Sequence, residues 1–131
     1  MRGSFLHNRV MVDRIAARYL ARGAIVRREC PTRDGRDTGY VDLCIDEDGR
    51  RWVYEAELGP QRVPNGLTKA RELGANVLTF VAPNGSVLSR IRRALRQMGD
   101  TNELTVRVLT LGALLKELDR PADLTGCGIG C

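Results

Sequence analysis

The 131-residue sequence contains no apolar run close to the roughly 20 residues that a membrane-spanning helix needs. Its first residues are polar and interrupted by charges, unlike a secretory signal peptide. Internal repeats and low-complexity tracts are also lacking. We therefore expect a cytoplasmic protein without membrane contact, with a single domain in residues 1–119 and a loose tail in residues 120–131.

Cysteine is scarce and forms no CxxC pair. Cys30 and Cys44 fall in predicted strands, where a small buried thiol is ordinary, whereas Cys127 and Cys131 belong to a glycine-rich tail. We expect all four cysteines to be free thiols in a reducing compartment. A zinc or cluster site in the tail is the alternative, although a second pair of ligands is missing.

Lysine is nearly absent, because 19 of the 21 basic residues are arginine. Charge is also unevenly distributed: residues 31–60 hold eight acidic residues and four arginines, and the segments 1–30 and 61–100 are both strongly basic. Arginine grips phosphate oxygens in pairs, so basic flanks around an acidic segment indicate a metal site acting on a polyanion. A general compositional bias toward arginine explains part of the pattern.

Residues 39–58 predict a β-hairpin around which the rest of the chain is organised. Asp48-Gly49 is a strong signal for a two-residue turn. Because strand side chains alternate, we expect two faces on the first strand: Tyr40, Asp42 and Cys44 on one, and Val41, Leu43 and Ile45 on the other. On the second strand the faces are Val53, Glu55 and Glu57 against Trp52, Tyr54 and Ala56.

Three carboxylates of this hairpin can converge. An antiparallel pairing places Asp42 near Glu55 and Glu57, and acids two residues apart in an apolar strand are costly to bury without a cation. We interpret them as a metal site. The alternative is an exposed edge hairpin with solvated acids.

The remaining pattern alternates between helices and strands. We expect helices at 5–22, at 67–73, over the apolar repeat from Val87 to Met98, and at 113–118, and strands at 24–30, 76–82 and 104–109. The two prolines and the Asn65-Gly66 pair predict a loop at 59–66. Strand, helix and strand in succession imply a parallel pair, and hence an α/β domain with a mixed sheet.

This order, with a lone Asp and then an acid-x-acid pair, resembles the PD-(D/E)xK nuclease superfamily. The resemblance implies a restriction-endonuclease-like α-β-β-β-α-β core with a mixed sheet flanked by helices. Within the superfamily, the run EAELGP and the later RELGANVLTFVAPNGSVLSRIRRAL resemble replication-relaxation proteins of mobile elements. The implied function is metal-dependent hydrolysis of DNA phosphodiester bonds.

The resemblance assigns roles residue by residue. Asp42 matches the Asp of the motif, Glu55 its second acid and Glu57 its Lys position, and all three would hold Mg²⁺ or Mn²⁺. The Lys can migrate to the following helix, where Lys69 stands. Lys69 is therefore a candidate catalytic residue, against an ordinary solvated lysine.

Basic residues on the predicted helices and in the loop at 59–66 are candidate contacts to DNA. They are His7, Arg14, Arg18, Arg62, Arg92 and Arg93, which a solvated helix face would equally explain. The functional alternative is a catalytically inactive nuclease-fold module that binds DNA or a protein partner in plasmid replication or transfer. A homodimer is compatible with cutting of two strands.

Overall fold

The computed structural model describes residues 2–32, 39–99 and 103–120, with the backbone alone for residues 2–7. The helices and strands follow one another in the predicted order. The elements are α1 (Arg2–Ala21), β1 (Ile25–Pro31), β2 (Tyr40–Glu47), β3 (Arg50–Ala56), α2 (Val63–Glu72), β4 (Val77–Ala82), α3 (Gly85–Met98), β5 (Thr105–Thr110) and α4 (Leu111–Asp119).

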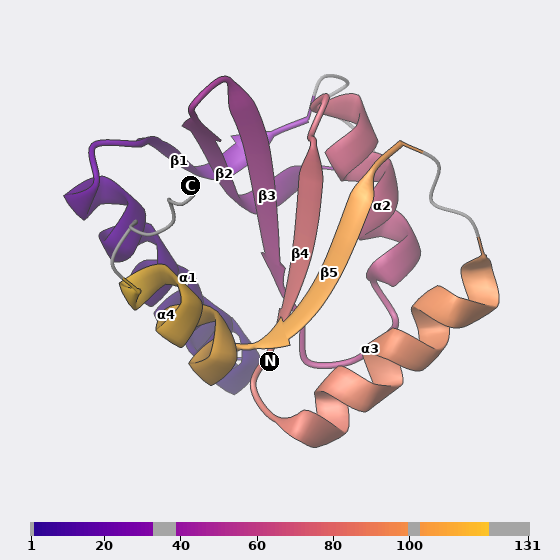
Figure 1. The fold of residues 1–131 in the computed structure, drawn as a ribbon. Helices are drawn as coiled ribbons and strands as arrows, with labels where there is room; N and C mark the ends of the chain where they lie inside the picture. The colour runs from indigo at the N-terminus through magenta and orange to yellow at the C-terminus, as the bar shows by residue number, and fades with distance from the viewer. Residues whose placement is uncertain (1, 33–38, 100–102, 121–131) are drawn as a thin grey trace.

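The strands form one mixed sheet in the order β1-β2-β3-β4-β5. β1, β2 and β3 are antiparallel neighbours, whereas β3, β4 and β5 run parallel. The expected parallel pair and the α/β class are therefore confirmed. Because β3, β4 and β5 share a direction, their carboxyl ends meet at one edge of the sheet, the lower edge in Figure 1.

Helices cover both faces of the sheet. α1 and α4 pack on one face and α2 and α3 on the other, as Figure 1 shows. Every residue of β4 is buried, as expected for a strand covered on both sides. The helix predicted at 5–22 is observed as α1, and one side of it faces the core, since Val12, Ile15, Ala16 and Tyr19 are all buried.

The hairpin turn is as predicted. Glu47 pairs with Arg50, which leaves Asp48 and Gly49 as the two turn residues, with φ of 55° and 75°. Positive φ at both positions matches the right-handed twist of the flanking strands, and this requirement favours the Asp-Gly pair.

The predicted alternation of β2 is wrong at its first residues. Val41 lies in the same core as Cys44 and Val53, whereas Leu43 and Ile45 pack on the opposite face. The regular pairing of β2 with β3 also stops at Leu43. The strand therefore changes its facing at Asp42, which the sequence pattern did not indicate.

The predicted loop at 59–66 is also wrong in its second half. α2 begins at Val63 instead of Leu67, with Pro64 in its first turn. A proline there loses no helical hydrogen bond, because the first amides of a helix have no partner within it. Gly66 is needed for packing: a Cβ on it would lie 2.8 Å from Cε1 of Phe80.

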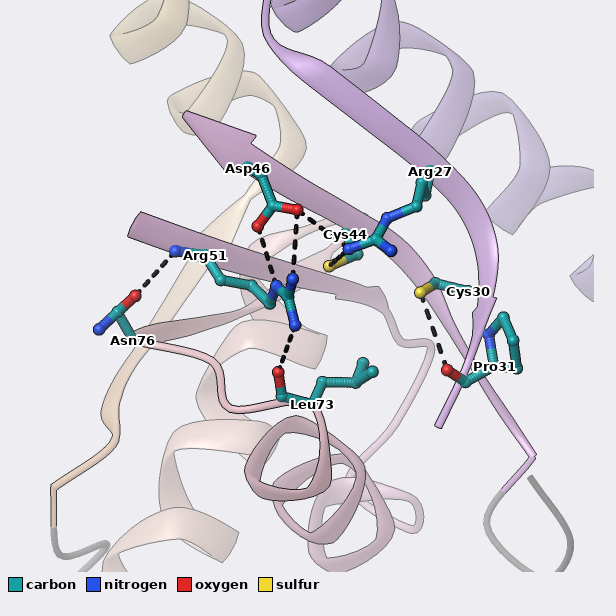
Figure 2. A network of polar contacts seen from close by, with 8 residues as sticks. All are labelled: Arg27, Cys30, Pro31, Cys44, Asp46, Arg51, Leu73 and Asn76. Atoms are coloured by element: carbon teal, nitrogen blue, oxygen red, sulfur yellow. Dashed lines mark hydrogen bonds and ion pairs between the residues drawn. The ribbon is translucent and has the colours of Figure 1, made fainter. Parts of the chain in front are cut away.

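A polar network fixes the other end of α2 to the hairpin (Figure 2). Arg51 donates through Nη1 to the carbonyl of Leu73 at 2.6 Å, and through Nε to Asp46 Oδ1 at 2.8 Å. Its main-chain amide donates to Asn76 Oδ1 at 2.7 Å, and Arg27 contacts the same Asp46 at 3.0 Å. The network therefore holds α2 at a fixed place along β3.

The cysteine prediction is confirmed where it can be observed. Cys30 and Cys44 are buried free thiols, and Arg27 points to the sulfur of Cys44 at 3.7 Å (Figure 2). Cys127, Cys131 and the tail from residue 121 lie outside the described residues. Within the described ranges, no helix has both the length and the apolar character to cross a membrane.

Candidate metal and phosphate site

Two hydrogen bonds between side chain and backbone link Asp42 to the neighbouring residues Glu55 and Ala56 at the end of β3. The amide of Asp42 donates to Glu55 Oε1 at 2.9 Å, and the amide of Ala56 donates to Asp42 Oδ2 at 2.8 Å. These bonds replace the regular ladder beyond the pair of Leu43 and Tyr54. The predicted proximity of Asp42 and Glu55 is thus observed, although by a local change of strand geometry.

Lys69 of α2 completes this cluster. Its Nζ lies 2.7 Å from Glu55 Oε2 and donates to the carbonyl of Tyr40 at 2.8 Å. Lys69 is only 7% exposed and Glu55 only 2%, which excludes an ordinary solvated lysine. A buried ammonium is retained only where acceptors surround it, and here a carboxylate and a carbonyl do so.

Glu57 lies just beyond the end of β3. It is 8% exposed, and its amide donates to the carbonyl of Val81 on β4 at 3.0 Å. Asp42 and Glu57 together line a groove of about 750 Å³, whereas Glu55 lies behind its wall. The groove therefore presents Asp42 and the buried Glu57 together with the exposed Glu29 of β1, and Glu55 supports the site from the interior.

The protonation of all three acids is disturbed. Burial raises the pKa of Glu55 to about 7, and the neighbouring Asp42 charge adds to the effect. Burial likewise raises the pKa of Glu57 to about 8, followed by repulsion from Glu55 and Asp42. The pKa of Asp42 is raised by burial as well. For all three acids, the effect of burial on the pKa therefore exceeds the opposing effect of the Lys69 charge.

The groove has basic and amide side chains opposite the acids. It is bounded by α1, by β1, by the start of the hairpin and by the segment between β3 and α2, and its lining includes Asn8, Arg9, Arg28, Gln61 and Arg62. Asn8 donates to the carbonyl of Ala56 at 3.2 Å, and its Oδ1 is buried without a hydrogen-bond partner among the described residues. Carboxylates and positive groups thus share one groove.

The donor set suits a hard divalent cation, since Mg²⁺ and Mn²⁺ prefer carboxylate oxygens and use few protein ligands. Across residues 2–32, 39–99 and 103–120, however, no three Cys, His, Asp or Glu side chains are grouped as a complete metal site. Asp42 and Glu57 are accessible from the groove, and both oxygens of Glu55 face protein partners. The fit is thus to a cation held mainly by two carboxylates.

The five predicted DNA contacts whose side chains are described divide into three groups. Arg62 lines the groove, and Arg14 and Arg18 lie on α1 outside its lining, with Arg18 paired to Asp119 at 3.0 Å. Arg92 and Arg93 are exposed on α3, and the side chain of His7 lies outside the described part of the chain. Among the candidates whose side chains are described, Arg62 alone therefore lines the groove together with the acids.

Sequence reasoning missed Asn8 and Arg9. Both are in the basic segment 1–30, but the spacing of apolar residues in α1 predicts only which face of the helix is buried. Where that helix crosses the end of β3 depends on tertiary packing. The one usable signal was their position beside His7, already a candidate contact.

Comparisons with protein-family models and with curated protein sequences find no match to this chain.

Proposed function

We propose that the protein is a metal-dependent nuclease-like hydrolase acting on phosphodiester bonds of DNA, with a restriction-endonuclease-like core. One observation carries the proposal: Lys69 Nζ lies 2.7 Å from Glu55, so α2 supplies the positive charge missing at Glu57. The four residues expected from the resemblance are thereby in one cluster, although they come from β2, the end of β3 and α2.

Asp42 and Glu57 would hold Mg²⁺ or Mn²⁺, with Glu55 behind them. When bound, the ion would supply Lewis-acid polarisation of the phosphate and a water of lowered pKa. Lys69 is held by Glu55 and by the Tyr40 carbonyl behind the groove wall, so it would act on the site through its charge and not by contact with the phosphate. In the metal-free protein, Glu57, whose pKa is raised to about 8, would be largely protonated near neutral pH, and it would give up this proton when the ion binds.

A second function is favoured by a different observation. Both Glu55 oxygens are already engaged, by the Asp42 amide and by Lys69. This pairing leaves neither Glu55 oxygen free to bind a metal ion. It therefore fits a nuclease-fold module that has lost catalysis and still binds DNA, as in plasmid replication or transfer. In that case the groove would bind nucleic acid without hydrolysing it.

An activity assay separates the two functions. Supercoiled plasmid and end-labelled single strands are incubated with protein and Mg²⁺, Mn²⁺ or EDTA. We expect cleavage with either metal, none in EDTA, and a loss of at least about 100-fold in Asp42→Asn and Glu55→Gln. Asp119→Asn is the matched control, because it alters an exposed Asp on α4. Equal traces of cleavage in wild type and Asp42→Asn would reject the enzyme.

A further inference from the structure

Two arginines line the groove without forming an ion pair with a described acidic residue. Arg9 of α1 and Arg62, which directly precedes α2, are both exposed, and neither makes an ion pair with any described residue. Arg28 in the same groove differs, because it is bonded to Asp13. An unpaired guanidinium facing a groove remains free to bind an anion, and its planar fork matches phosphate oxygens.

These two arginines lie on opposite sides of the acids. α1 packs on one face of the sheet and α2 on the other, as Figure 1 shows. Asp42 and Glu57 are at the end of the sheet between these layers. Arg62 is near enough to Asp42 and Glu57 to lower their pKa values, although burial raises the same pKa values by more. A path along the groove therefore passes from one cation, over the carboxylates, to the other.

We propose that the groove binds a nucleic-acid strand laid across the end of β3, with Arg9 and Arg62 each holding a phosphate on either side of the one facing Asp42 and Glu57. This inference rests on the proposed function for the identity of the central phosphate. A mononucleotide would satisfy only one of the two arginines, whereas a strand offers consecutive phosphates to both. The volume, about 750 Å³, is also toward the upper end of small-ligand pockets.

The test measures binding without hydrolysis. A fluorescein-labelled single strand and a duplex of the same sequence are titrated with full-length protein in EDTA, by anisotropy, over a series of salt concentrations. Each of Arg9→Ala and Arg62→Ala should weaken binding several-fold and reduce the slope of log K against log salt by about 0.7–0.9. Arg50→Ala is the control, because it removes one exposed charge at the opposite end of β3.

Three outcomes overturn the inference: no wild-type binding at low salt, unchanged binding in both groove variants, or an equal loss in Arg50→Ala. An unlabelled mononucleotide that displaces the strand at equal phosphate concentration would also contradict it.

Failure of the proposed hydrolysis can be distinguished from failure of the proposed strand site. If cleavage is absent but the groove variants still lose salt dependence, the strand site stands and only catalysis is rejected. Intact cleavage in the Arg9→Ala, Arg62→Ala double variant leaves the enzyme and removes the strand site.

Discussion

At the scale of the residue, the most important charged group is the buried ammonium of Lys69. This ammonium is paired with Glu55 in the interior, and water from the surface cannot reach Glu55 to take its place. Breaking a buried pair by removing one partner leaves an uncompensated charge in the interior, which costs more than the pair itself contributes.

Lys69→Met should therefore destabilise the fold by about 3 kcal/mol, measured by urea unfolding at neutral pH. The chain provides its own control, because the other lysine, Lys116, is exposed on α4 and Lys116→Met should change the free energy of unfolding by less than about 0.5 kcal/mol. Adding Glu55→Gln to Lys69→Met should recover part of the loss. Equal stability of the two lysine variants would contradict the buried pair.

At the scale of the element, the placement of α2 determines whether Lys69 reaches Glu55. Two contacts set that placement. Gly66 allows the helix to approach Phe80 closely, and Arg51 fixes the far end through the Leu73 carbonyl. The helix is thus held at both ends, with Lys69 between them.

Gly66→Ala should push α2 away from the sheet, because the added methyl would overlap the Phe80 ring. We expect a loss of about 1–3 kcal/mol in thermal or urea unfolding. Gly112→Ala in α4 is the matched control: nothing lies within 4 Å of the added Cβ, so it should be neutral or stabilise by up to about 1 kcal/mol. If Gly66→Ala behaves like Gly112→Ala, the close packing of α2 is wrong.

At the scale of the whole molecule, the acidic groove makes stability depend on pH. The pKa of Glu57 is about 8 in the folded protein against an ordinary 4.5, so the unfolded chain loses this proton first. Between these values the folded state binds more protons than the unfolded state, and stability falls as pH rises. Glu55, with a pKa of about 7, adds to the fall over the lower part of the window.

In metal-free protein, the free energy of unfolding should therefore decrease from pH 5 to pH 8, by at most about 1.4 kcal/mol per pH unit for each group. Glu57→Gln should flatten the dependence, because its amide carries no charge at either end. Glu117→Gln, an exposed acid of α4, should leave the profile unchanged. Urea titrations at several pH values measure this, and an identical slope in wild type and Glu57→Gln would refute the assigned protonation.

Much of this architecture could be read from local sequence. Asp48-Gly49 determines the turn, and that turn sets the register of Leu43 with Tyr54, which brings Asp42 to Glu55. Two features resisted prediction because packing overrides local preference. Val41 changes side where β2 leaves the ladder, and Pro64-Asn65-Gly66 form a helical turn because Gly66 fits against Phe80. The part of the groove formed by Asn8 and Arg9 depends on where α1 crosses the sheet, which no periodicity encodes.

The central claim is that Asp42 and Glu57 share a divalent cation. Calorimetric titration of Mn²⁺ into metal-free protein, in two buffers of different ionisation enthalpy, tests it directly. We expect saturable binding with release of protons, because ligand carboxylates of raised pKa must give up protons when the ion binds. Asp42→Asn should abolish the binding and Asp119→Asn should preserve it. Absence of saturable heat in wild type, or the same isotherm in Asp42→Asn, would contradict a metal centre in this groove.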